Sequence, residues 1–202
     1  MCNGECMMDD GDMSLRIGDS FPDMELRAYD PKKDEEVTLK TADYKGKWQI
    51  YFFYPADFTF VCPTELEEMA DMYADFQKEG VEVFSVSTDT VYTHKAWHDE
   101  SAAIKKVQFM MIADRTGELS HLFGTYIEEE GNSLRGTFII DPNGVLKTIE
   151  INNNDIGRSG KELLRKLRAA KFVNEHGGQV CPASWEPGEE TLKPGMDLVG
   201  KI

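Results

Sequence analysis

The order of apolar and polar residues predicts a buried strand that leads directly into a helix. A nearly unbroken aromatic and aliphatic run, Trp48 to Tyr54, ends at Pro55. Such a run is typical of a strand that is buried on both faces. Apolar residues then recur at helical spacing from Pro63 to Lys78, and Gly80 ends the pattern. The short segment between these two elements is therefore a strand-to-helix connection.

The rest of the chain continues this alternation of short strands and helices. Apolar runs predict two strands within 21–41 around a polar turn at 30–34, strands at 81–87 and 106–113, and a hairpin at 136–151. Helical spacing predicts helices at 90–102, 118–123 and 160–172. A β-α-β-α-β order, followed by a hairpin and a helix, predicts an α/β fold in which helices flank a mixed central sheet. The first strand pair adds an N-terminal hairpin.

Three parts of the chain differ in composition. Residues 1–14 are small, acidic or Met and have no periodicity, which predicts a flexible leader. Residues 15–172 carry the periodic pattern and form the predicted domain. Residues 173–202 are rich in Gly, Pro and polar residues and predict an extended C-terminal arm.

Composition and charge exclude several classes of protein. The chain has 202 residues, of which 41% are hydrophobic and 29% charged, as in an ordinary globular protein. Its net charge of −15 disfavours binding to phosphate backbones, so we expect no nucleic-acid partner. No apolar run approaches the roughly 18 residues of a membrane span. The acidic first residues do not fit a signal peptide, so we expect a cytoplasmic protein.

The four cysteines are too few for a secreted disulfide scaffold. Cys2 and Cys6 form a Cys-x-x-x-Cys pair in the leader, but no second pair completes a metal site, and we expect no catalytic role for them. His94 and His98 stand four apart on a predicted helix, where a structural role is more common than metal binding. Hence no metal is expected.

Cys62 has the most informative position, because it begins the helix that follows the buried strand. Pro63 suits the first helical position, where its missing N–H is not needed. The free amides and the dipole of a helix N-terminus stabilise an anion such as a thiolate. Thr59 lies three residues earlier and can direct a hydroxyl to the same place. Position alone leaves open whether Cys62 is a nucleophile or only fills the junction, and the nearby Glu65 disfavours an anion unless a cation is close.

The spacing Pro55-x-x-x-Thr59-x-x-Cys62, inside the string 52–65, resembles the active-site motif of the peroxiredoxins. The similarity extends to three further segments in the same order, namely 87–90, 134–141 and 180–182. These matches resemble the typical two-cysteine branch of the family, and the closing residues 197–202 are similar to its bacterial members. The resemblance implies a thioredoxin-like fold, which agrees with the predicted α/β architecture.

The resemblance also implies roles for several side chains. Cys62 would attack the terminal oxygen of a hydroperoxide and become a sulfenic acid, with release of water or an alcohol. Thr59 and nearby amides would donate hydrogen bonds to the peroxide oxygens, and Pro55 would shield the thiolate from water. Arg135 matches the active-site arginine of the family and would supply the required cation.

Glu65 and Arg158 match a second pair in the family that orients Arg135. No organic cofactor and no metal are implied for peroxide reduction.

Cys181 matches the resolving cysteine of this branch. It would attack the sulfenic acid of Cys62 in another subunit and form a disulfide, which makes a homodimer the minimum working unit. The family often builds rings of five dimers. A flavin-dependent reductase subunit or a thioredoxin-like protein would then reduce the disulfide. The basic residues of 161–171 are a candidate docking surface for it, although such a pattern is more typical of a solvated helix face.

Two other functions compete with a peroxidase. A large ring that holds unfolded proteins would be a binding protein rather than an enzyme. A thioredoxin-type disulfide reductase is disfavoured, because the chain has no Cys-x-x-Cys pair. Peroxide-sensitive relatives carry a Gly-Gly-Leu-Gly segment and a C-terminal Tyr-Phe pair, and this chain has neither. We therefore expect a loosely held tail and resistance of Cys62 to over-oxidation.

Overall fold

The computed structural model describes residues 14–202. Apart from Ser14, the predicted leader lies outside these residues, and so do Cys2 and Cys6.

A seven-stranded mixed sheet forms the centre of the fold, in the order β2-β1-β5-β4-β3-β8-β9. Strands β3, β4 and β5 run parallel, whereas β8 pairs antiparallel with β3, and β9 pairs antiparallel with β8. The hairpin of β1 and β2 joins β5 on the other side. The strands of the sheet are β1 (Glu25–Asp30), β2 (Glu35–Lys40), β3 (Trp48–Phe53), β4 (Val81–Ser87), β5 (Met110–Ala113), β8 (Arg135–Ile140) and β9 (Leu146–Asn152).

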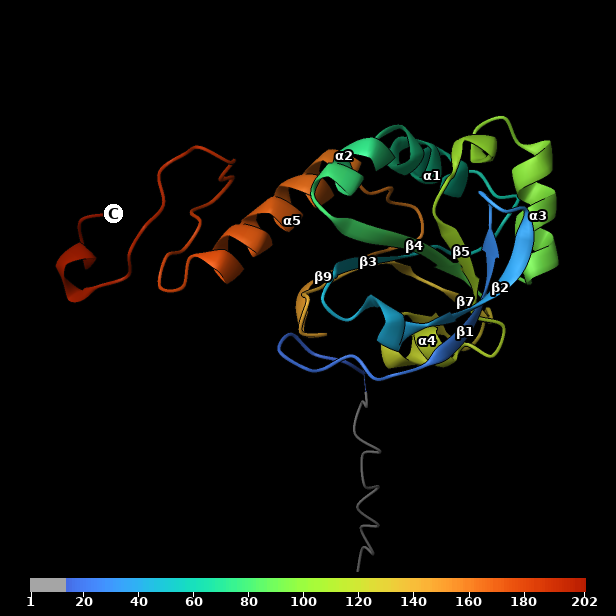
Figure 1. Cartoon of the computed structure of the whole chain (residues 1–202), viewed down its shortest axis with the longest axis horizontal. Coiled ribbons are helices and arrows are strands. Elements are labelled where there is room, and N and C mark those ends of the chain that lie inside the picture. Colours follow the sequence, from blue (N-terminus) through green and yellow to red (C-terminus); the bar gives the residue numbers. More distant parts are fainter. Residues whose placement is uncertain (1–13) are drawn as a thin grey trace, which may run out of the picture.

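Helices cover both faces of this sheet (Figure 1). The helices are α1 (Cys62–Asp71), α2 (Tyr73–Lys78), α3 (Val91–Glu100), α4 (Glu118–Leu122) and α5 (Gly160–Glu175). One hydrophobic cluster joins α1, α2, α3 and α5 to one face, and a second joins α4 and the first strands to the other. The predicted α/β fold with a mixed sheet and an N-terminal hairpin is confirmed.

Strand β3 lies between these two clusters, as its continuous apolar sequence requires. Side chains alternate across a strand, so Ile50 and Phe52 enter the cluster under α1, whereas Tyr51 and Phe53 enter the cluster over α4. All six residues of β3 are buried. The strand is therefore a fixed support for the loop that follows it.

Two predicted elements, a helix and a strand, are wrong in their bounds. The helix expected over 63–78 is two helices that meet at Met72, whose backbone dihedrals are φ −93° and ψ 0°. The strand expected over 106–113 begins only at Met110, where it first pairs with Phe84 of β4, and its pairing with β1 begins at Met111. Of the buried residues before it, Ile104 belongs to a 3-10 turn, Ile104–Lys106, whereas Val107 and Phe109 lie between that turn and the strand.

A two-stranded hairpin was not predicted at all. It consists of β6 (Tyr126–Ile127) and β7 (Asn132–Ser133). Strands of two residues show no alternation that a sequence pattern could reveal.

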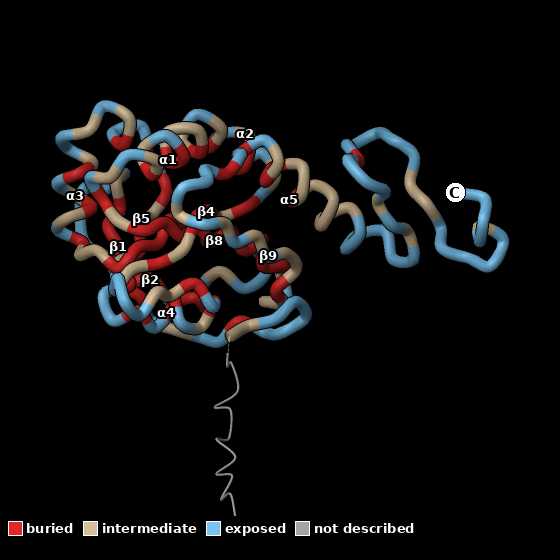
Figure 2. Tube along the Cα trace, turned by 180° about the vertical axis from the view of Figure 1, so that it is seen from behind, coloured by how far each residue is buried: buried red, intermediate tan, exposed pale blue. Residues whose placement is uncertain are grey.

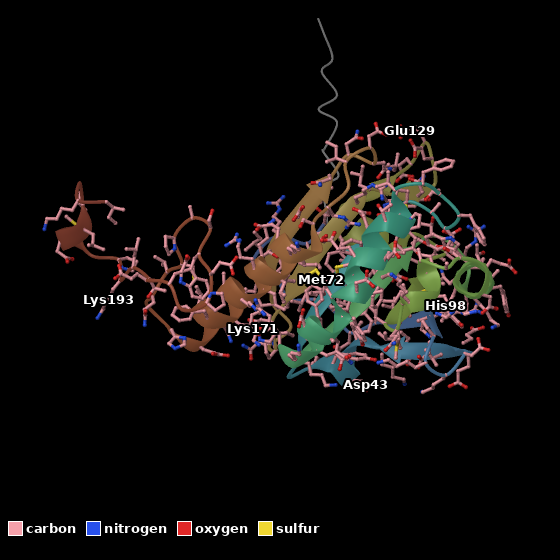
Figure 3. The ribbon with its side chains drawn as sticks, turned by 90° about the horizontal axis from the view of Figure 1, so that it is seen from above. Asp43, Met72, His98, Glu129, Lys171 and Lys193 are labelled. Carbon is pink, nitrogen blue, oxygen red and sulfur yellow. The ribbon has the colours of Figure 1, made fainter. Side chains whose placement is uncertain are left out.

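The C-terminal arm lies at the end of α5 and extends away from the sheet (Figure 1). Helix α5 continues to Glu175, three residues past its predicted end. Most of the arm is exposed (Figure 2), and Figure 3 shows Lys193 on the arm beyond the part of α5 that carries Lys171. Within the described residues, no helix is long and apolar enough to cross a membrane.

Candidate active site

Cys62 is the first residue of α1, and its side chain is fully buried. The tight backbone turn before it is closed by Thr64 and Glu65, whose N–H groups both donate to the carbonyl of Val61, at 3.0 and 3.3 Å. Pro63 follows in the first turn, where it fits without loss of a hydrogen bond. The structure thus places the thiol at the positive end of a helix, as the sequence predicted.

Arg135 lies beside this thiol although it is 73 residues away in the chain. It begins β8, which pairs with β3, and its side chain is 4% exposed. Its Nη1 atom lies 3.3 Å from the Cys62 Sγ and 2.8 Å from a carboxylate oxygen of Glu65. Its Nε donates to the carbonyl of Asn154 at 2.8 Å. Arg135 is therefore the close cation that a Cys62 thiolate requires.

Glu65 is the centre of the network that holds this arginine. Its carboxylate accepts hydrogen bonds from Arg135 Nη1 and from the backbone N–H, Nε and Nη2 of Arg158, over 2.7 to 3.0 Å. The side chains of Glu65 and Arg158 are each 2% exposed. A carboxylate with four donors around it is fully satisfied despite its burial.

Arg158 is fixed on its other side as well. Its Nη1 donates to the carbonyl of Gly136 at 2.6 Å and to the Thr137 hydroxyl at 3.0 Å, and its guanidinium lies 3.5 Å from the ring centre of Phe52. Burial lowers the pKa of Arg158, and the Glu65 carboxylate opposes that shift.

The charges of this site indicate what it can do. Two arginines and one glutamate sum to +1, so a neutral Cys62 thiol leaves an unbalanced buried positive charge. A thiolate cancels that charge and accepts the bond from Arg135. The arrangement therefore places a cation beside the Cys62 sulfur, where it can also face an oxygen that gains negative charge.

Pro55 and Thr59 lie in the loop between β3 and α1. Pro55 is buried, and Thr59 is partly buried. The Thr59 hydroxyl donates to the carbonyl of Ala56 at 2.8 Å, which leaves its oxygen able to accept a further hydrogen bond. Phe58 stands between them with φ +55°, an unusual conformation for a residue with a side chain.

A buried polar network that sequence reasoning missed holds this loop. The Tyr54 hydroxyl donates to Asp57 at 2.7 Å, and His94 Nδ1 lies 2.8 Å from the other oxygen of Asp57. His94 Nε2 lies 3.2 Å from the carbonyl of Ile112, so this nitrogen is the donor. Burial raises the pKa of Asp57, and His94 opposes that shift.

His94 is therefore a buried structural residue, in agreement with its expected role. The described part of the chain contains no group of three side chains that could hold a metal ion.

Cys181 lies apart from these residues, on the C-terminal arm. Its Sγ is 3.9 Å from the carbonyl of Ala169 on α5, in a groove of about 550 Å³ that Lys147, Arg165 and Val180 also line. Burial raises the pKa of the Cys181 thiol, and the nearby Arg165 opposes this. Both Cys62 and Cys181 are free thiols.

The basic residues of α5 are largely paired. Arg165 bonds Glu162, Lys166 bonds Glu150, and Arg168 and Lys171 both bond Glu79, each at 2.7 to 2.8 Å. This pairing is that of a solvated helix face, and it weakens the case for a basic docking surface.

Comparisons with known proteins show which families and relatives this chain resembles. The sequence profile of the AhpC/TSA family matches residues 17–149, and that of the C-terminal domain of 1-Cys peroxiredoxin matches residues 169–199. The chain is 54% identical over 176 residues to alkyl hydroperoxide reductase C of Staphylococcus epidermidis, covering 87% of this chain and 93% of that protein. It is 52% identical over 171 residues to alkyl hydroperoxide reductase C of Escherichia coli K12, covering 85% and 91%.

Two solved structures of similar proteins superpose on this chain. Enterococcus faecalis AhpC superposes with a TM-score of 0.79 at 48% identity, over 82% of this chain and 98% of that one. The reduced Plasmodium vivax 2-Cys peroxiredoxin superposes with a TM-score of 0.86 at 30% identity, over 91% and 95%.

Proposed function

The chain belongs to the AhpC/TSA family of peroxiredoxins, and from that premise we propose that it reduces hydroperoxides with Cys62 as the attacking thiol. The observation that carries this proposal is the 3.3 Å contact between Arg135 Nη1 and the buried Cys62 Sγ at the start of α1. Hydrogen peroxide and organic hydroperoxides are the proposed substrates, and antioxidant defence is the proposed role.

The first half-reaction oxidises Cys62. The thiolate attacks the terminal oxygen of the hydroperoxide, an S–O bond forms, and the O–O bond breaks. One proton reaches the leaving oxygen, so a thiol and a hydroperoxide give a sulfenic acid and an alcohol or water. Arg135 stabilises the charge that develops on the oxygens. Thr59 already donates to Ala56, so we propose that its oxygen accepts the O–H of the hydroperoxide.

The surrounding residues hold this geometry. Glu65 and Arg158 fix the guanidinium of Arg135. Pro55 is buried in the loop before α1 and limits access of water to the thiol. No cofactor takes part in this step.

The second half-reaction uses Cys181. Its thiol attacks the sulfenic acid of Cys62 in a second subunit, an S–S bond forms, and water leaves. The arm that carries Cys181 lies beyond the sheet of its own subunit, at the far end of α5, which supports a bond between subunits (Figure 1). Residues 173–202 are thus proposed as the resolving arm, residues 15–172 as the peroxidase domain and residues 1–14 as a leader without a role in the chemistry.

This cycle requires partners. We propose a homodimer, supported by the open edge strand β9 with its half-exposed Ile149 and Ile151, and a ring of five dimers as the larger assembly. A disulfide reductase, either a flavin-dependent subunit or a thioredoxin-like protein, closes the cycle. The free thiols suit a reducing cytoplasmic location.

Stopped-flow measurement of peroxide consumption tests the proposal. We expect Cys62→Ser to abolish consumption and Cys181→Ser to keep the first, stoichiometric reaction. A Cys62→Ser protein that still consumes a full equivalent of peroxide would show that another group is oxidised first.

A further inference from the structure

The exposed C-terminal arm has one fixed point, Trp185. From Lys171 to Ile202 this is the single buried residue, with 2% of its surface exposed. Its ring packs on Phe172 of α5 with the ring centres 4.9 Å apart. Arg165 of α5 donates to the Trp185 carbonyl at 3.1 Å. Both contacts tie the arm to the helix.

The segment around Trp185 is also closed on itself. The backbones of Val180 and Leu192 exchange two hydrogen bonds, at 2.9 and 3.0 Å. The Trp185 indole N–H donates to the carbonyl of Glu189 at 3.1 Å, inside the same loop. Residues 180–192 therefore form one loop, and Cys181 stands directly beside its closing pair.

This fixed point limits where Cys181 can go. Cys181 is four residues from Trp185, so a docked Trp185 keeps it within about 14 Å of that residue even when the chain between them is fully extended. The last residue of α5, Glu175, is six residues before Cys181. If Trp185 is not docked, Cys181 can therefore lie up to about 21 Å from Glu175. Undocking of Trp185 thus frees Cys181 from its groove on α5 and lengthens its reach.

We propose that Trp185 is a positioning residue for the resolving step. It holds the loop of Cys181 against Phe172 and Arg165, and it must leave this site before Cys181 attacks the Cys62 sulfenic acid of the partner subunit. The inference rests on the proposed function, because it assigns a step within that cycle. The sequence predicted a loosely held tail, and Trp185 is the specific restraint on it.

Two substitutions of Trp185 distinguish the loss of its contact with Phe172 from a general effect on the fold. Trp185→Ala removes the ring, whereas Trp185→Phe keeps an aromatic contact with Phe172. We expect Trp185→Ala to need roughly five- to tenfold more peroxide for half conversion of Cys62 to sulfinic acid, because Cys181 reaches the sulfenic acid sooner. Trp185→Phe should stay within about twofold of the wild type. Mass spectrometry during turnover measures both.

A second measurement tests the restraint without turnover. In a Cys62→Ser background, alkylation of Cys181 should be several-fold faster in Trp185→Ala than with Trp185 present. An unchanged alkylation rate would overturn the proposal, because Trp185 would then not restrain Cys181. A Trp185→Ala protein that over-oxidises at an equal or lower peroxide concentration would also overturn it, because Trp185 would then help to bring Cys181 to Cys62.

The rate of the first oxidation of Cys62 separates this inference from the proposed function. That rate should be the same in wild-type and Trp185→Ala proteins, because Trp185 has no contact with the network around Cys62. Failure of the proposed function would instead appear as peroxide consumption by Cys62→Ser.

Discussion

Replacing Glu65 with glutamine removes the charge that holds Arg135 and Arg158 together beside Cys62. The glutamine has nearly the same shape, so the change tests charge and hydrogen bonding rather than volume. Its single oxygen can accept at most two of the four bonds that the carboxylate accepts. Its NH₂ group must then face N–H donors of the arginines.

The burial of this network sets the expected magnitude. The side chains of Glu65, Arg135 and Arg158 are all 4% exposed or less, so solvent cannot replace the lost partner. Removing one member of a buried ion pair costs about 3–5 kcal/mol. The charge of the site with a thiol rises from +1 to +2. We therefore expect Glu65→Gln to lower the free energy of unfolding by about 3–5 kcal/mol at neutral pH.

The substitution should cost less free energy in the transition state of peroxide reduction than in the stability of the fold. Arg135 keeps its bond from Nε to the carbonyl of Asn154, so the guanidinium loses one of its anchors and not all of them. A loss of about 1.4 kcal/mol in the transition state would slow the reaction of Cys62 with peroxide about tenfold.

Glu67→Gln is the matched control, because Glu67 lies on the same helix in an exposed pair with Lys106 at 2.7 Å. Their side chains are 40% and 45% exposed, and such a pair contributes about 0–1 kcal/mol. Urea denaturation of the reduced proteins gives the free energy of unfolding of both variants. The same protein concentration is used throughout, so that self-association affects both variants equally. If the two variants lose the same stability, the reasoning from burial is refuted.

Three further outcomes follow from the site. Arg135→Lys should slow the reaction with peroxide about 100-fold, as measured by stopped flow. A single ammonium cannot reproduce the planar guanidinium that bonds Asn154, Glu65 and the Cys62 thiol at the same time. A rate within twofold of the wild-type rate would contradict this. Cys181→Ser should give no covalent dimer on non-reducing gels after one equivalent of peroxide, and a persistent dimer would identify another resolving thiol. Burial raises the pKa of Asp57, so its contribution to stability is complete below its ordinary pKa of 3.8 and is lost as the pH rises through the folded value. Asp57→Asn should therefore show a flatter stability profile between pH 4 and 8, and equal slopes in urea titrations would exclude Asp57 as the group.

The position of Cys62 could be predicted from the sequence because its signals are local. A buried run that ends at Pro55 and a proline just after the cysteine together define a strand-to-helix junction. The partners of Cys62 could not be derived in this way. Arg135 is 73 residues distant, and only the resemblance to peroxiredoxins indicated it.

Other features depend on tertiary packing that no local pattern contains. The break at Met72 occurs without Gly or Pro, so the helical spacing of the buried residues continues through it. Asn154 contributes a backbone carbonyl, which carries no sequence signal. Phe52 was predicted as a buried strand residue, but its place under Arg158 depends on how the loop after β9 folds back.

The connection between α5 and the loop held by Trp185 is where we expect a protease to cut the subunit first. Residues 176–178 are exposed, and Gly178 has φ +83°, as in an open turn. A single cut there would leave the segment that contains Cys181 held only by the contacts of Trp185 with α5, and its loss would leave the sheet, its helices and Cys62 intact. The truncated enzyme would react once with peroxide and then need an external small thiol to regenerate. Limited digestion would thus convert a two-cysteine peroxidase into a one-cysteine peroxidase without a change in its core.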